Sequence, residues 1–430
     1  MYKAFVAKID KVEPIEKAET IQKAFVLGSQ VIVSKEKKEG DVVLFFPEEG
    51  VLSDDFLKEN NLYRHSNLNK DKNKKGYFDD NGRIRTQKFL GEKSEGFVAE
   101  LNALNYLGKI NDLQVGDEIQ TINGVVVAKK YINSKTLEAA QRNKNKKKKF
   151  RAIFTEMFPQ HFDTEQFRFY KDKIKKGSLI TISSKIHGTS GRYGCVKVKH
   201  NLPKWKATLN KVFRLSKTEE WQYLVGTRRV DLYEEENAKE SYHGSEQFRF
   251  DILEYLKPYL EKNMVIYGEI VGWANGKPLM PPHDISKLKD KDYTKKYGRE
   301  ILYKYNNRVG ENSFVVYRIA YVNEDGKATD LSPFQAQAWC EKRGLKFVKT
   351  VFPSFIYDGD VKKLERIVED LTERPQVLTE DYNDPSHISE GVVVRVDGPD
   401  GVDFFKNKSF AFKVMESIIK ESDFDLEDAS

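Results

Sequence analysis

Short runs of alternating apolar and polar residues fill most of the first 130 positions of the chain. β-Branched and aromatic residues gather in these runs, and turns such as Glu39–Gly40–Asp41 and Val115–Gly116–Asp117 separate them. The runs are MYKAFVAKI, KAFVLGSQVIVSK, DVVLFFP, GFVAEL and DEIQTINGVVVAKKYI. Because so many short strands follow one another closely, the pattern predicts a small β-barrel over residues 1–135.

After residue 153, longer apolar runs alternate with segments of helical spacing. Helices are expected over 246–262, over 333–343 with Ser332 as the N-cap, and over 359–373. Strands are expected at SLITISSKI, NMVIYGEIVGWA, NSFVVYRIAYV, EGVVVRVDG and SFAFKVM, and GRYGCVKVKH is expected to form a hairpin with SLITISSKI. This mixture predicts an α+β domain over residues 153–430, with mainly antiparallel sheets and flanking helices.

Between these regions lies a cationic joint, residues 136–152, which contains QRNKNKKKKF. Such runs form exposed linkers, and clustered lysines also contact nucleic-acid phosphates; the sequence leaves both alternatives open. The formal charge of the whole chain, +7, does not by itself identify a polyanion-binding protein. Two distant cysteines, no apolar signal core and no run of membrane-spanning length predict a soluble cytoplasmic protein without disulfides.

Lys185 is a long cationic side chain at the point where a predicted strand ends and the chain must turn tightly. In ISSKIHGTSGR, Lys185 follows a predicted strand and precedes His187 and Gly188, where the chain must turn. A solvated lysine beside a turn is one interpretation. The other is a nucleophilic amine at a phosphate site, because Ile186 would exclude water and glycine permits close approach of a ligand to the backbone.

Charged residues also stand beside glycine at several other strand ends. Arg228 follows Gly226, Glu269 follows Gly268 in an apolar strand, and Glu390 precedes Gly391. Lys413 lies inside an apolar run. A carboxylate on an apolar strand is costly unless it is paired or binds a metal. Each residue alone is better explained as a surface group at a strand end, whereas the set fits a nucleotide and divalent-metal pocket.

Taken in order, these motifs resemble those of the covalent nucleotidyltransferases, which comprise ATP-dependent DNA and RNA ligases and mRNA capping enzymes. The series is K-x-[DH]-G, an arginine, Y-G-E, an aromatic strand, E-G-x-V-[VI] and a final lysine, and it spans residues 178–417. KIHG, with histidine in the third position, is similar to the RNA ligase 2 branch. The preceding β-rich region resembles the OB module of Deinococcus-type RNA ligases.

The resemblance implies an ATP-dependent RNA ligase that joins a 3′-hydroxyl to a 5′-phosphate. Its lysine becomes a lysyl-AMP, and the AMP then passes to the RNA 5′ end. Lys185 is the implied nucleophile, Arg228 contacts the RNA phosphate, and Lys413 contacts the α-phosphate. Glu269 and Glu390 hold Mg²⁺ or Mn²⁺ through water. The implied nucleotide-binding residues are Lys185, Ile186, His187, Gly188, Arg192, Glu269, Phe314, Tyr317, Glu390 and Lys413.

The chain departs from the family pattern in two places. The last motif usually carries two lysines as K-x-K, but Ala411 precedes Phe412 and Lys413 here, so Lys406 or Lys408 is a candidate for the missing lysine. Arg318 also stands where the family has an acid. A DNA ligase, a capping enzyme and an inactive nucleic-acid-binding homologue remain alternatives.

The OB module is expected to grip RNA or RNA-containing duplex ends with basic and aromatic side chains. The candidates are Arg83, Arg85, Lys88 and Phe89, which an ordinary loop–strand boundary explains equally well. The histidines show no metal-ligand spacing. Residues 275–284 are expected to form a loop near the pocket, either a lid or a plain surface loop. No membrane association is expected, and the protein is expected to act as a monomer.

Overall fold

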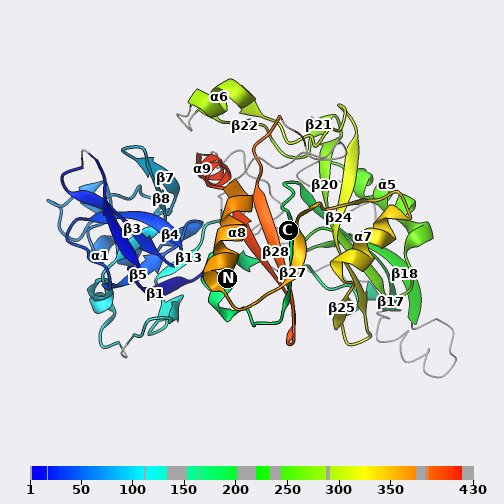
Figure 1. The fold of residues 1–430 in the computed structure, drawn as a ribbon, viewed down its shortest axis with the longest axis horizontal. Coiled ribbons are helices and arrows are strands. Elements are labelled where there is room, and N and C mark those ends of the chain that lie inside the picture. Colours follow the sequence, from blue (N-terminus) through cyan, green and yellow to red (C-terminus); the bar gives the residue numbers. More distant parts are fainter. Residues whose placement is uncertain are drawn as a thin grey trace, which may run out of the picture. The chain divides into compact units, whose positions relative to one another are not determined.

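A computed structural model of the chain describes residues 2–16, 18–110, 113–132, 153–162, 164–200, 219–232, 244–286, 291–373, 384 and 386–418. The predicted basic joint, residues 136–152, lies wholly outside these residues. The chain divides into two compact units (Figure 1). Unit 1 contains residues 1–132, 168–170 and 416–418, and unit 2 contains 133–167, 171–415 and 419–430. No helix in the described residues is long and apolar enough to cross a bilayer.

Unit 1 is built from short antiparallel strands around two apolar clusters. Its four-stranded sheet has the order β10-β1-β5-β9, with β10 at Glu118–Ile119, β1 at Ala4–Lys8, β5 at Val42–Phe46 and β9 at Phe97–Ala99. A second sheet contains β2 (Lys11–Pro14), β3 (Ile21–Val26) and β4 (Ser29–Ser34). The two-stranded pairs are β6 (Gly50–Leu52) with β13 (Ala128–Lys130), β7 (Thr86–Phe89) with β8 (Glu92–Glu95), and β11 (Thr121–Ile122) with β12 (Val125–Val126).

The strand-rich character predicted for this region is confirmed, whereas the strands of the described residues form separate sheets and no closed barrel. Successive side chains of a strand point to opposite faces of its sheet, so every second residue can be buried. Val6, Leu44 and Phe46 are buried in this way in one of the apolar clusters. The helices are short: α1 (Asp54–Glu59), capped by the Ser53 side chain, and the 3₁₀ turns η1 (Ser66–Leu68) and η2 (Leu101–Leu107).

The larger sheet of unit 2 has nine strands. The central order is β19-β18-β17-β20-β24-β25, and β14, β21 and β26 pair with β17, β20 and β24. The bounds are β14 Ile153–Phe154, β17 Thr189–His200, β18 Glu219–Gly226, β19 Asp231–Leu232, β20 Met264–Ala274, β21 Lys277–Pro278, β24 Asn312–Val322, β25 Ala328–Asp330 and β26 Lys346–Phe347. Two helices, α5 (Gln247–Leu256) and α7 (Pro333–Glu341), pack on one face of this sheet through Leu253, Leu256 and Trp339.

A second, five-stranded sheet of unit 2 has the order β15-β29-β28-β16-β27. Its strands are β15 (Glu165–Gln166), β16 (Leu179–Ser184), β27 (Thr350–Ile356), β28 (Gly391–Gly398) and β29 (Gly401–Lys408). The helix α8 (Val361–Glu373) packs on β28 and β29. The other elements described are η3 (Lys171–Lys173), η5 (Lys257–Tyr259), β22 (His283–Asp284), α6 (Lys291–Tyr297), β23 (Glu300–Ile301), α9 (Phe410–Ile418), and α3 (Phe167–Tyr170), whose residues divide between the two units.

Two local predictions for unit 2 are wrong. The segment 191–200 is no hairpin partner of β16, because β16 pairs with β27 and β28 while β17 pairs with β18 and β20 in the other sheet. The run SFAFKVM is the start of the helix α9 and not a strand. The Ser409 hydroxyl accepts the backbone N–H of Phe412 at 3.3 Å, and this N-terminal cap favours a helix over the strand that the alternation suggests.

Candidate functional site

The Lys185–Gly188 segment carries the chain from one sheet of unit 2 to the other. It joins the end of β16 in the five-stranded sheet to the start of β17 in the nine-stranded sheet. Backbone bonds fix the crossover on both sides: the Lys185 N–H donates to the Gly391 carbonyl at 2.9 Å, and the His187 N–H donates to the Tyr305 hydroxyl at 2.7 Å. Lys185, the lysine with the unusual position in the sequence, therefore lies where the chain passes from the five-stranded to the nine-stranded sheet.

Gly188 permits a close approach between this crossover and β20. A Cβ atom added at Gly188 would lie 2.6 Å from the Ile270 carbonyl oxygen and 2.8 Å from the Val271 Cγ1 atom. Real Cβ atoms do not approach neighbours so closely, so any side chain would push the crossover away from the strand that carries Glu269. The glycine of the motif thus brings two parts of the site together.

The ammonium group of Lys185 pairs with a buried carboxylate. Its Nζ atom lies 2.9 Å from Oε1 of Glu390, whose side chain is only 4% exposed, while the lysine side chain is 22% exposed. The two residues meet because Gly391 opens β28 directly beside β16. The second oxygen of Glu390, Oε2, is buried, has no hydrogen-bond partner among the described residues, and lies 3.7 Å from Nδ1 of His187. One oxygen of this carboxylate is therefore available to another positive group.

Glu269 is the second buried carboxylate of the site. It projects from β20 opposite Ser190, whose hydroxyl donates to its Oε1 atom at 3.1 Å. Its Oε2 atom is buried, and no described residue forms a hydrogen bond with it. Burial raises the pKa of Glu269 to about 7; the charges of Lys185 and Arg228 oppose this rise, and the charge of Glu390 adds to it. The described site thus contains two acids, each with one unsatisfied oxygen.

These two acids fit a divalent cation held mainly by water. Buried oxygens without partners are expensive unless a cation or water satisfies them, and Mg²⁺ characteristically keeps several waters. Among the described residues, no group of three or more histidine, cysteine or acidic side chains is arranged around a common metal position. Glu269 and Glu390 are therefore the residues of this site that could hold a metal, and waters would complete its coordination.

The two aromatic candidates on β24 lie on opposite faces of the sheet. Tyr317 lies on the side of Glu269: burial and the charge of Glu269 raise its pKa, and its ring lies 5.1 Å from that of His161. Phe314 instead packs in the helix-covered core with Tyr193, at a ring distance of 4.9 Å. The Phe314 ring, predicted to contact the nucleotide, fills the space beneath Gly268, on the face of the sheet opposite to Tyr317.

The two arginine candidates also differ in their surroundings. Arg228 lies in the turn after β18, is partly exposed, and its positive charge acts on both Glu269 and Tyr317. Arg192 is 2% exposed; it pairs with Asp231 and donates to the Phe158 carbonyl at 2.6 Å. The guanidinium of Arg192, predicted to bind the nucleotide, is thus engaged in contacts within the protein.

Three lysines follow β28, and the one expected on a strand, Lys413, lies on a helix instead. Lys413 is buried on α9, while Lys406 and Lys408 are two residues apart on β29 and so share a face of that strand. Lys408 is 8% exposed, stands opposite Gly391 in the β28–β29 pair, and its charge acts on His187. Lys406 and Lys408 thus have the spacing of the usual K-x-K motif on one strand.

A group of buried aromatic and histidine side chains, not anticipated from the sequence, surrounds His187. The rings of His283, Tyr303 and Phe412 lie 5.4, 4.7 and 5.0 Å from its ring, and Tyr303 also contacts His387 at 4.7 Å. Burial, followed by the neighbouring positive groups, lowers the pKa of His187 well below its ordinary value, so the ring is neutral. These residues come from distant segments, and no spacing in the sequence connects them.

The residues expected to bind nucleic acid in unit 1 lie on or next to β7. The Phe89 ring lies 5.6 Å from that of Tyr77, Lys88 is exposed, and Arg85 lies 3.9 Å from Asp79. The Arg83 guanidinium packs over the Tyr131 ring at 4.0 Å. The four candidates are thus neighbours along one strand and its preceding turn, with Lys88 the most open to solvent.

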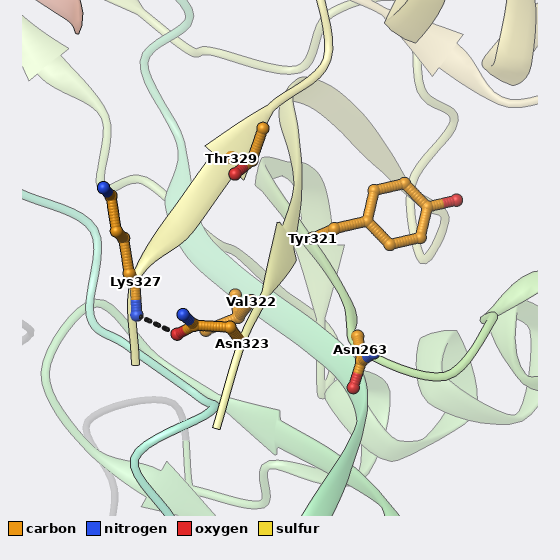
Figure 2. Close-up of a pocket in the computed structure, with 6 residues that line it drawn as sticks. All are labelled: Asn263, Tyr321, Val322, Asn323, Lys327 and Thr329. Carbon is orange, nitrogen blue, oxygen red and sulfur yellow. Dashed lines mark hydrogen bonds between the residues drawn. The ribbon is translucent and has the colours of Figure 1, made fainter. Parts of the chain in front are cut away.

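A pocket of 330 Å³ lies elsewhere in unit 2, at the β24–β25 hairpin (Figure 2). Asn263, Tyr321, Val322, Asn323, Lys327 and Thr329 line it. The Asn323 side-chain oxygen accepts the backbone N–H of Lys327 at 2.8 Å, so this amide closes the turn. None of the candidate catalytic residues borders this pocket.

Comparisons with known proteins agree with this arrangement. A family model described as RNA ligase matches residues 179–415, whereas no curated protein sequence matches the chain. A mutant of Naegleria gruberi RNA ligase with AMP and Mn is 17% identical, with a TM-score of 0.55 over 95% of this chain and 97% of that one. A second mutant with ATP and Mn has a TM-score of 0.56 at 17% identity, over 95% and 98% of the two chains. At this identity the likeness shows a shared fold.

Proposed function

The chain belongs to the RNA ligase family, and we propose from this that it seals RNA ends with ATP through an adenylate carried by Lys185. The observation that supports the proposal best is the lysine beside a buried carboxylate at the crossover between two sheets. The relatives with AMP or ATP and Mn are consistent with the same cofactors here. The physiological metal would be Mg²⁺ or Mn²⁺.

In the first step, the Lys185 Nζ atom attacks the α-phosphorus of ATP, and pyrophosphate leaves as the phosphorus–nitrogen bond forms. The amine must first lose a proton, because an ammonium group has no lone pair. Glu390 holds the resting ammonium and orients it. A cation bound at Glu269 and Glu390 would neutralise phosphate charge and favour the neutral amine.

In the second step, the RNA 5′-phosphate oxygen attacks the adenylate, and Lys185 leaves as the amine. In the third step, the RNA 3′-hydroxyl attacks the activated 5′-phosphate, and AMP leaves as the phosphodiester forms. Both steps require in-line positioning and charge neutralisation. Arg228 would contact the incoming RNA phosphate; its partial exposure and the effect of its charge on Glu269 support this role.

Nucleotide recognition is assigned to the residues around the crossover. Tyr317 stacks on adenine, and the Ile186–Gly188 backbone encloses the phosphates. Lys408 contacts the α-phosphate, the role that the sequence pattern gives to Lys413. Three observations support Lys408: its burial, its position opposite Gly391, and its effect on the pKa of His187. Lys413, also buried and one helical turn into α9, would add positive charge.

The N-terminal region, residues 1–135, is proposed to be an OB-like module that grips RNA or an RNA-containing duplex near the break. Its many short antiparallel strands and the Tyr77–Phe89 ring pair beside Arg85 and Lys88 support this proposal. The joint over 136–152 would connect it to the catalytic domain, residues 153–430. We expect the enzyme to act as a monomer inside the cell.

Incubation with ATP labelled in the α-phosphate, with magnesium, tests the proposal. The denatured protein should retain label that acid and hydroxylamine release, and adding 5′-phosphorylated RNA should remove the label as sealed product forms. Labelling from GTP would indicate capping chemistry, and discharge only by nicked DNA would indicate a DNA ligase. A wild-type protein that never acquires label would refute the proposal.

A further inference from the structure

A basic arm rises from the group of aromatic and histidine side chains next to Lys185. The arm comprises β22, α6 and β23, and its described residues are 283–286 and 291–301 (Figure 1). Its two strands pair through His283 with Ile301, and the Ile285 N–H donates to the Arg299 carbonyl at 2.9 Å. The arm is therefore an ordered two-stranded stem that carries a short helix.

At the base of the arm, residues from both of its strands contact His187 of the Lys185–Gly188 segment. On the first strand, the His283 ring lies 5.4 Å from the His187 ring. The second strand continues to Tyr303, which contacts the same ring at 4.7 Å, and to Tyr305, whose hydroxyl accepts the His187 N–H. Since His187 is two residues from Lys185, the arm is anchored directly beside the proposed nucleophile.

The helix of the arm presents exposed cations on one side and paired tyrosines on the other. Tyr293 and Tyr297 lie one turn apart, with stacked rings 5.9 Å apart. Lys291 and Lys295 are also one turn apart, on the opposite side, and both are exposed. Within the part of the chain that the structure describes, no carboxylate forms an ion pair with either lysine. The arm thus keeps its positive charge open to solvent.

We infer that this arm binds the phosphodiester backbone of the RNA strand next to the break. The inference rests on the proposed function, because it takes the neighbouring crossover to be the sealing site. Lys291 and Lys295 are about 6 Å apart along the helix, which is comparable to the separation of consecutive phosphates in a nucleic-acid strand. Paired lysines that neutralise phosphates release counterions, so the contact gains affinity without reading sequence.

The test compares Lys291→Ala/Lys295→Ala with a matched pair on another helix of unit 2. Lys362→Ala/Arg366→Ala removes the same charge at the same spacing from exposed positions of α8. Binding of a single-stranded RNA with hydroxyls at both ends is measured over a range of salt concentrations. Such an RNA cannot be adenylated, so the measurement is independent of catalysis.

The arm variant should bind more weakly at low salt, and the slope of log affinity against log salt should become shallower by about 1.4, from roughly 0.7 for each lost contact. Self-adenylation should stay at the wild-type rate. An unchanged slope, or an equal change in the α8 variant, would overturn the inference. So would a raised KM for ATP with unchanged RNA binding, because the lysines would then serve the triphosphate. Failure of the wild-type protein to self-adenylate would refute the proposed function alone.

Discussion

The Nζ atom of Lys185 lies 2.9 Å from Oε1 of Glu390, and the two residues flank two strands that pair with each other. Lys185 follows β16 on its way to the other sheet, while Glu390 precedes β28, the neighbour of β16. The pair is thus fixed by strand register and not by a flexible loop. A site built in this way is positioned before any ligand binds, which favours in-line chemistry.

Alanine at Gly188 should reduce self-adenylation far more than it reduces stability. The added methyl group would lie 2.6 Å from the Ile270 carbonyl oxygen, so the crossover must move away from β20. Lys185 would then be displaced relative to Glu269, and misplacement by about 1 Å can slow a reaction roughly a hundredfold. Single-turnover labelling and thermal unfolding measure the two effects. Wild-type labelling by Gly188→Ala would contradict the account.

Substitution of Phe314 should lower the stability of the protein, whereas substitution of Tyr317 should weaken its use of ATP. Phe314→Ala should lower the free energy of unfolding by about 3 kcal/mol, because the ring fills the core under α5 and α7. Tyr317→Ala should raise the KM for ATP by about tenfold, as expected for loss of one stacked base, while Tyr317→Phe should not. Denaturant unfolding and initial adenylation rates distinguish them. A raised KM for ATP in a fully stable Phe314→Ala protein would reverse the assignment.

Lys408→Ala should slow adenylation by about a hundredfold, the usual effect of removing one charge-stabilising group from a reacting phosphate. Lys413→Ala should have a smaller effect, because Lys413 lies on α9 and not on the strand beside Gly391. Each variant is assayed by single-turnover labelling at saturating ATP after its unfolding midpoint has been matched to the wild type. A larger loss in Lys413→Ala would return the α-phosphate role to Lys413.

Glu269 gives the metal-free protein a specific pH dependence. Its carboxyl holds a proton up to about pH 7 in the folded state but only to about 4.5 when unfolded. The folded state therefore binds more protons between these values, and stability falls as pH rises through this window. Glu269→Gln removes this loss, so its free energy of unfolding relative to wild type should increase by about 3 kcal/mol from pH 4.5 to 7.5. Unfolding in urea with a chelator measures this, and a difference independent of pH would contradict the raised pKa.

Local sequence pattern was sufficient for several parts of the structure. The apolar run around Glu269 forms β20 as expected, and Ser332 caps α7 through a reciprocal bond with Gln335. The motif residues Lys185, Glu269 and Glu390 do gather in one site. These features depend on residues close in sequence or on an ordered motif series, and both can be recognised without coordinates.

The remaining features depend on pairing between distant segments. Nothing local indicates that β17 leaves the sheet of β16, since both strands have the composition of hairpin partners. A bulge opposite Tyr267 and Gly268 makes Tyr317 the extra residue of β24, so the residues after it, such as Ile319, lie on the face opposite to the one that simple alternation from Phe314 gives. The histidines around His187 come from segments about a hundred and two hundred residues away.

The most direct test of the central claim is intact-protein mass spectrometry after incubation with ATP and magnesium. The wild-type protein should gain the mass of one AMP, and peptide mapping should locate it on Lys185. Lys185→Ala should gain nothing, while Lys176→Ala, a surface substitution in the same unit, should label normally. Adenylate on another residue, or RNA sealing by Lys185→Ala, would contradict the account.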